Sequence, residues 1–171
     1  YKDLIELLGS HGIDIELSGG ETADCGDVVR TLLVDAVISG RIKNSNIIDP
    51  RRIAPGDVIV GLGSAGKTNY ETVSNSGVGS NGLTLARHTL LSKAATEKYP
   101  EVVDPAVDPA ISYRGPYNIT DKPDGLGMTV GEALLSPTRT FAPALIQIYD
   151  ALGEDVHGAI HLTGGGLSKV L

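Results

Sequence analysis

The stretch of residues 61–80 constrains the fold most, because it begins like a nucleotide-binding loop and does not continue like one. Its first eight residues read GLGSAGKT and follow the apolar run of residues 58–60. These letters fit both the nucleotide-binding P-loop and the G-x-G-x-x-G pattern of dinucleotide-binding folds. Both patterns require a helix that begins at the loop and directs its amide groups toward the phosphates.

No helix is expected directly after this loop, because residues 67–80 are rich in Asn, Ser and Gly and lack an apolar stripe at helical spacing. Ser and Asn side chains compete for backbone hydrogen bonds, and Gly loses the most conformational entropy on folding. We therefore expect a strand over residues 57–62 and then a long loop, and neither P-loop nor dehydrogenase chemistry. The first clear amphipathic helix is predicted over residues 81–98, with Ser80 or Asn81 as its N-cap.

The composition narrows the possible partners and the compartment. Fourteen Lys and Arg residues against 21 Asp and Glu residues give a net charge of −7, which argues against a nucleic-acid partner held through its phosphates. The single cysteine, Cys25, favours a reducing compartment such as the cytoplasm. No apolar run approaches the roughly 20 residues that span a membrane. Because Tyr1 is not Met and leads into a helical stripe, we expect a piece of a longer polypeptide.

The hydrophobic pattern predicts an α+β fold, because helices and strands alternate without the regularity of a parallel βαβ series. Residues 44–56 contain two proline-containing turn signals and read as a linker. We therefore divide the chain into residues 1–50 and residues 51–171. Strands are predicted over residues 31–42, 57–62 and 156–162. Helices are predicted up to Gly9, over residues 81–98, 129–135 and 145–152, and from the glycines at 164–166 to residue 171.

Residues 100–124 are predicted to form an irregular insertion, because they contain five prolines. Tyr113 and Tyr117 lie between these prolines. Two alternatives remain open at this stage. The segment is either a surface insertion whose tyrosines pack locally or a lid over a binding groove.

Three glycine-rich junctions carry the candidate chemistry, because glycines let backbone amides approach an anion and hydroxyls add donors. In residues 19–22, Glu21 is a candidate base, metal ligand or orienting group, or else it caps a turn with Thr22. In residues 80–82, the expected helix start offers amides to a phosphate. Residues 161–166 join a polar strand end to three glycines, which favours an anion nest, whereas His161 alone is also typical of a buried core histidine.

A fourth candidate segment is Thr138-Arg139. A guanidinium binds phosphate or carboxylate through two parallel hydrogen bonds. The alternative is an arginine that is simply exposed to solvent.

Together and in this order, these segments resemble the phosphoribosylformylglycinamidine cyclo-ligase family, also called aminoimidazole ribonucleotide synthetases. The resemblance covers nearly the whole chain, and Leu-Leu-x-Pro-Thr-Arg is its most cyclo-ligase-like part. The segments that carry it are Gly19-Gly20-Glu21-Thr22-Ala23, residues 55–62, Ser80-Asn81-Gly82 with Leu85 and Arg87, residues 134–139, and His161-Leu162-Thr163-Gly164-Gly165-Gly166.

The resemblance implies a two-domain ATP-binding synthetase of which this chain is a central fragment, with both domains incomplete. Residues 1–50 then end the first, dimerising and ATP-binding domain, and residues 51–171 begin the second. The implied enzyme is an ATP-dependent, C–N bond-forming cyclo-ligase of purine biosynthesis, a cytoplasmic homodimer. It uses ATP and Mg²⁺ to close formylglycinamidine ribonucleotide, a small phosphorylated substrate, into aminoimidazole ribonucleotide. No membrane and no nucleic acid takes part, and the isolated fragment is expected to be inactive.

The resemblance also nominates site residues. Glu21 and His161 are the candidate catalytic residues. No metal ligand is assigned in this chain, because the family's Asp-rich ATP and magnesium segment is expected upstream. The candidate substrate- and ATP-binding residues are Gly19, Gly20, Thr22, Ser80, Asn81, Gly82, Thr138, Arg139, Thr163, Gly164, Gly165 and Gly166.

The chain departs from the family pattern at two motifs. Gly79 stands where the family usually has a His before Ser-Asn-Gly, and Cys25-Gly26 follows Asp24 where Met and Pro are usual. These departures leave one alternative open, a non-catalytic or altered-substrate ATP-binding paralogue of the same superfamily.

Overall fold

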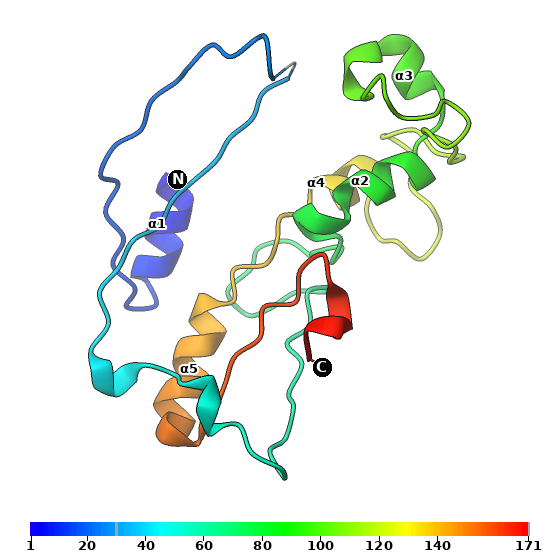
Figure 1. Cartoon of the computed structure of the whole chain (residues 1–171). Helices are drawn as coiled ribbons and strands as arrows, with labels where there is room; N and C mark the ends of the chain where they lie inside the picture. Colours follow the sequence, from blue (N-terminus) through cyan, green and yellow to red (C-terminus); the bar gives the residue numbers. More distant parts are fainter. Residues whose placement is uncertain (30, 171) are drawn as a thin grey trace. The chain divides into compact units, whose positions relative to one another are not determined.

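The computed structural model describes residues 1–29 and 31–170 (Figure 1). It divides into two compact units. Unit 1 contains Tyr1–Asp24, Val34–Gly61 and Thr140–Leu171. Unit 2 contains Cys25–Leu33 and Leu62–Arg139. The chain therefore passes between the units several times. The domain division expected after residue 50 stays a prediction.

Helices supply the regular structure in both units. Unit 1 holds α1 (Lys2–Gly9), α5 (Ala142–Leu152) and the 3-10 turns η1 (Asn44–Asn46), η2 (Pro50–Arg52), η4 (Gly153–Asp155) and η5 (Gly166–Val170). Unit 2 holds α2 (Gly79–Leu90), α3 (Ala94–Lys98), η3 (Pro100–Val102) and α4 (Val130–Leu135). No helix in the described part of the chain is both long enough and apolar enough to cross a membrane.

The short helices α4 and α5 form where local sequence signals are strong. Thr129 caps α4, because its side chain accepts a hydrogen bond from the Glu132 amide at 3.2 Å while the Glu132 carboxylate accepts one from the Thr129 amide at 2.8 Å. This reciprocal arrangement is a capping box. Pro143 lies in the first turn of α5, where its missing N–H costs nothing. These two helices and α1 confirm the predictions made for them.

The predicted helix over residues 81–98 is wrong as a single element. It ends as α2 at Leu90, and α3 begins only at Ala94. Between them the Ser92 amide donates to the Tyr117 carbonyl at 2.9 Å, and Leu91 forms an isolated parallel bridge with Tyr117. A contact with a distant segment therefore replaces the helical hydrogen bonds that the local pattern favours.

The three predicted strands are not present in the described residues. Segments 31–42, 57–62 and 156–162 contain no strand, and the two β-type pairings of the described chain are isolated bridges. A strand is stable only when its amides and carbonyls have partners on a neighbouring strand. The apolar side chains of 31–42 and 58–60 are exposed, with Leu32 and Val37 each 91% exposed. The α+β class therefore remains an expectation, because the described residues show its helices without its sheet.

The last predicted helix is also corrected in part. Residues 166–170 form the 3-10 turn η5, a tighter structure than the predicted α-helix, and residue 171 lies outside the described residues.

The hydrophobic core cluster of unit 2 includes a residue of the irregular segment, Tyr113. Leu91, Tyr113 and Val130 are buried together. The rings of Tyr113 and His88 pack in a T-shaped arrangement, with centroids 4.8 Å apart and planes at 78°. The ring of Tyr113 thus packs against residues outside the segment 100–124, and both alternatives for this segment, the insertion and the lid, stay predictions.

Candidate functional site

The first turn of α2 meets the segment that contains Thr138. The Ser80 amide donates a hydrogen bond of 3.2 Å to the Thr138 hydroxyl, Oγ1. The structure therefore brings together two of the segments that the sequence nominated separately. Ser80 and Asn81 are exposed, so this helix start is open to solvent.

The predicted N-cap of this helix is wrong. The N-cap is Val78, whose side chain makes no capping hydrogen bond, so Ser80, Asn81 and Gly82 lie within the first turn of α2. The first four N–H groups of an α-helix have no partner inside the helix. Thr138 supplies the missing hydroxyl for one of these groups from 58 residues away. The partial positive charge of the helix start also favours an anion near the Asn81 and Gly82 amides.

The first turn of α4 differs, because its amides are satisfied within the chain. The Val130 amide donates to the Asp121 carbonyl at 2.8 Å, and the Gly131 amide donates to the Ile119 carbonyl at 2.7 Å. The Glu132 amide donates to the Thr129 hydroxyl. The start of α4 is therefore closed to a ligand, whereas Asn81 and Gly82 at the start of α2 remain candidates for one.

Arg139 follows Thr138 in the sequence and is buried, with 8% of its surface exposed. Its Nε and Nη2 groups donate to the two carboxylate oxygens of Glu71 at 2.8 and 2.9 Å. Its remaining donors meet the carbonyls of Gly63, Ala65 and Gly66 at 2.6, 3.4 and 2.7 Å. The alternative of a solvated surface arginine is therefore wrong for Arg139, and every donor of the guanidinium is engaged within unit 2.

The electrostatics of the Arg139–Glu71 pair follow from these contacts. The side-chain hydrogen bonds from Arg139 lower the pKa of the Glu71 carboxyl, against a smaller opposing effect of desolvation. The pairing with Glu71 raises the pKa of Arg139. Both groups are therefore charged at neutral pH.

We expect the Glu71 contribution to stability to disappear in acid. A carboxyl whose pKa is lowered by folding stabilises the folded state above its unfolded pKa, about 4.3, and loses this effect as the pH falls through its folded pKa. The difference in free energy of unfolding between wild type and Glu71→Gln should therefore be constant above about pH 5 and shrink below about pH 4. Urea unfolding at a series of pH values measures it. A difference that stays constant down to pH 3 would contradict the pairing.

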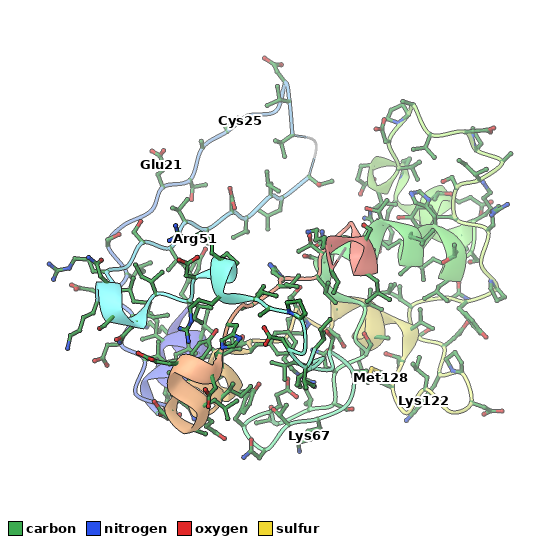
Figure 2. All side chains as sticks on the ribbon, turned by 60° about the horizontal axis from the view of Figure 1, so that its bottom comes forward. Glu21, Cys25, Arg51, Lys67, Lys122 and Met128 are labelled. Atoms are coloured by element: carbon green, nitrogen blue, oxygen red, sulfur yellow. The ribbon has the colours of Figure 1, made fainter. Side chains whose placement is uncertain are left out.

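The GLGSAGKT loop has the opposite polarity to a P-loop. A P-loop directs its backbone N–H groups toward a phosphate, whereas here the carbonyls of Gly63, Ala65 and Gly66 converge on a guanidinium. No helix follows until Gly79. Lys67 is exposed, and Figure 2 shows its side chain pointing away from the loop.

Replacing this lysine tests the same point. We expect Lys67→Ala to leave the dissociation constant for ATP unchanged, because the side chain is exposed and the loop directs carbonyls, which do not bind phosphate, toward Arg139. Isothermal titration calorimetry with ATP and Mg²⁺ measures the constant. A loss of ATP binding would restore the P-loop interpretation.

The candidate residues of unit 1 lie in two segments, residues 19–22 and residues 161–166. The first has no regular structure, and the second leads into the 3-10 turn η5. Residues 18–22 form no turn, and Glu21 and Thr22 are exposed, so the turn-capping alternative is wrong (Figure 2). His161 is also exposed, so the alternative of a buried core histidine is wrong. In the glycine-rich segment, the Gly166 amide donates to the Thr163 carbonyl at 2.8 Å, and Lys169 donates to the Thr163 hydroxyl.

Sequence reasoning missed three residues that organise unit 2. Glu71 binds Arg139, Asn75 pairs with Gly66 through two backbone hydrogen bonds of 2.8 and 2.9 Å, and Ser76 donates to the Ala133 carbonyl at 2.7 Å. All three lie in the segment whose composition indicated only a loop. The one available signal was Glu71 itself, an isolated carboxylate in a Gly- and Ser-rich stretch.

Curated proteins named phosphoribosylformylglycinamidine cyclo-ligase are similar to nearly the whole chain. The protein from Sorangium cellulosum is 35% identical over 153 residues, which cover 88% of this chain and 35% of that protein. The resemblance to the cyclo-ligase family is confirmed. The Methanococcus vannielii cyclo-ligase is 34% identical over 158 residues, which cover 92% of this chain and 35% of that protein. The Methanosarcina mazei cyclo-ligase is 31% identical over 165 residues, 96% of this chain and 39% of that protein.

The chain therefore spans between 35% and 39% of the length of these three cyclo-ligases. No protein-family model matches the chain.

Proposed function

We propose that the protein closes formylglycinamidine ribonucleotide into aminoimidazole ribonucleotide, in an ATP-dependent step of purine biosynthesis. The observation that carries this proposal is the similarity to proteins named as cyclo-ligases over 88–96% of the chain. In the proposed setting the protein is a cytoplasmic homodimer that acts on a small phosphorylated substrate.

The start of α2 is the proposed phosphate-binding element of unit 2. Its first-turn amides at Asn81 and Gly82 point along the helix dipole, and backbone N–H groups at such a position bind anions. The Thr138 hydroxyl holds the neighbouring Ser80 amide and so fixes the orientation of this turn. Thr138 also lies beside Gly79, since a Cβ at position 79 would stand 3.4 Å from its Oγ1. That distance is an ordinary contact, and glycine is favoured at position 79 because its φ is 59°, in the left-handed region.

In unit 1 we propose Glu21 and His161 as catalytic groups. Both side chains are exposed and thus accessible to a substrate. The glycines at 19, 20, 164 and 165 are proposed to offer backbone amides to the phosphates of substrate and ATP. The Gly166 amide is engaged with the Thr163 carbonyl, so its proposed part is to shape this segment. Thr22 and Thr163 add hydroxyl groups to these two segments.

ATP supplies the phosphoryl group that activates the formyl oxygen in the proposed reaction, and Mg²⁺ accompanies it. No group of three or more His, Cys, Asp and Glu side chains within residues 1–29 and 31–170 is arranged to hold a metal ion. We therefore assign none of the described residues as a magnesium ligand. Their proposed part is to bind phosphate groups and to orient the substrate.

The decisive experiment is an assay of the polypeptide as the cell makes it. Purified protein is mixed with formylglycinamidine ribonucleotide, ATP and Mg²⁺, and aminoimidazole ribonucleotide and phosphate are both quantified. Substrate-dependent formation of both products in equal amounts is expected. Phosphate release with a different substrate, or ATP binding without turnover, would overturn the proposal in favour of the altered-substrate or non-catalytic alternative.

A further inference from the structure

The buried Arg139 connects several parts of unit 2, and its guanidinium is not available to bind a ligand. Its five N–H groups meet five acceptors, two on Glu71 and three on the backbone of the GLGSAGKT loop. A guanidinium has five donors, so none remains for a bound phosphate or carboxylate. Because both side chains of the ion pair are largely buried, its geometry is held without competition from solvent.

The loop that Arg139 binds comprises residues 63–76. The pair of backbone hydrogen bonds between Gly66 and Asn75 closes the loop. Asn75 is itself buried, and its side chain donates to the Pro137 carbonyl at 2.8 Å. The Ser76 amide donates to the Ser136 hydroxyl at 3.1 Å. Contacts from both ends of the loop therefore converge on residues 136–139.

The same short segment also reaches α2. Thr138 is the residue next to Arg139, and its hydroxyl accepts the hydrogen bond from the Ser80 amide. The Gly77 amide donates to Asn75 Oδ1 at 2.8 Å, so the chain between the loop and α2 is fixed as well. Arg139 is thus connected to the first turn of α2 along two routes, through Thr138 and through Asn75.

We infer that Arg139 is a positioning residue that aligns the first turn of α2 for anion binding and does not contact the ligand. Its consequence for catalysis rests on the function proposed above, whereas its consequence for the order of α2 does not. Lysine cannot replace it, because one ammonium group has three donors and cannot serve the Glu71 carboxylate and three carbonyls in one plane. Exchanging the two charges also fails, because a carboxylate at position 139 would face three carbonyl oxygens.

Hydrogen exchange on the ligand-free polypeptide, as the cell makes it, tests the positioning directly. In Arg139→Met we expect the amides of Gly66, Asn75, Ser76 and Ser80 to exchange much faster than in wild type. Glu71→Gln keeps the arginine and its carbonyl contacts, so it should fold and show a smaller effect at the same amides. Arg139→Lys should exchange as fast as Arg139→Met at these amides. The charge-swapped double variant Glu71→Arg/Arg139→Glu should not restore the slow exchange of wild type.

Variants of Thr138 separate the two routes. Thr138→Val removes the acceptor for the Ser80 amide and should accelerate exchange at Ser80 alone, with Gly66 and Asn75 unchanged. Thr138→Ser keeps the hydroxyl and should behave as wild type. The matched control is Arg51→Met, which removes an arginine from the exposed pair with Asp49 and should change none of these amides.

Steady-state kinetics then test the catalytic consequence. A misplacement of about 1 Å can cost roughly 100-fold in rate, so Arg139→Lys should lower kcat by about that factor while KM changes much less. The inference is overturned if Arg139→Met and Glu71→Gln keep wild-type exchange at Gly66, Asn75 and Ser80 while the dissociation constant for ATP rises. If wild type makes no aminoimidazole ribonucleotide but the exchange results hold, the proposed function fails and the positioning role stands.

Discussion

Gly115→Ala is expected to destabilise unit 2 by about 3 kcal/mol or more, since inserted atoms in a well-packed region cost 1–3 kcal/mol and here they meet backbone. A Cβ at position 115 would stand 2.0 Å from both the carbonyl carbon and the carbonyl oxygen of Leu90. The backbone cannot easily move away, because the Gly115 amide donates to the Leu91 carbonyl at 2.9 Å. The neighbouring amides of Arg114 and Tyr117 bind the His88 and Leu90 carbonyls at 2.8 and 3.0 Å.

Urea unfolding of wild type and variant measures this loss of stability. The matched control is Gly9→Ala at the end of α1, where no atom lies within 4 Å of the added Cβ. That control should be neutral or slightly stabilising, because Ala has less conformational entropy to lose than Gly. A Gly115→Ala variant as stable as the control would show that residues 113–117 do not lie against the end of α2.

Tyr113→Ala is expected to cost about 3–5 kcal/mol, the usual range for removing a large aromatic side chain from a core. Tyr113 is 1% exposed and packs with Leu91 and Val130. The variant also loses the edge-to-face contact with His88. The backbone of Tyr113 has a φ of 49°, an uncommon conformation for a residue other than Gly, so the packing has to offset that strain.

Tyr113→Phe isolates the ring from its hydroxyl. The hydroxyl donates only a long hydrogen bond of 3.4 Å to the Val102 carbonyl. We therefore expect Tyr113→Phe to lose less than about 1 kcal/mol. Thermal unfolding of wild type, Tyr113→Phe and Tyr113→Ala measures the order of their stabilities. Near-equal stability of Tyr113→Ala and wild type would favour the lid alternative for residues 100–124, because a lid residue contributes little to the closed core.

Sequence reasoning predicted the helices whose signals are local. The apolar stripe before Gly9, the spacing in residues 145–152 and the start at Thr129 each identify a helix without help from distant residues. The break between α2 and α3 was missed, because it depends on the contact of Ser92 with Tyr117, 25 residues along the chain. The strand predictions were wrong because strands, too, depend on distant residues. Their apolar residues were read correctly as β-prone, but a strand requires a partner, and the described residues supply none.

The candidate site was predicted as a set of segments and not as an arrangement. Ser80 and Thr138 were both nominated, and the structure joins them by a hydrogen bond. Arg139 was nominated for its charge, yet that charge is met by Glu71, which stands 68 residues earlier and belongs to no motif. A motif records which residue types occur, whereas burial and pairing decide whether a charged group faces a ligand or the interior.

The carbonyl contacts of Arg139 also bear on how freely this loop can change over evolutionary time. Gly63, Ala65 and Gly66 meet the guanidinium through backbone oxygens, which every amino acid has. Selection for this contact therefore acts on position 139 and on the path of the backbone. It includes Gly66, whose φ of 85° favours glycine, and acts only weakly on the identity of the other loop residues. Neutral drift can then bring a sequence such as GLGSAGKT to this place, and a saturation-mutagenesis map should be tolerant at Ser64 and Lys67 and intolerant at Arg139.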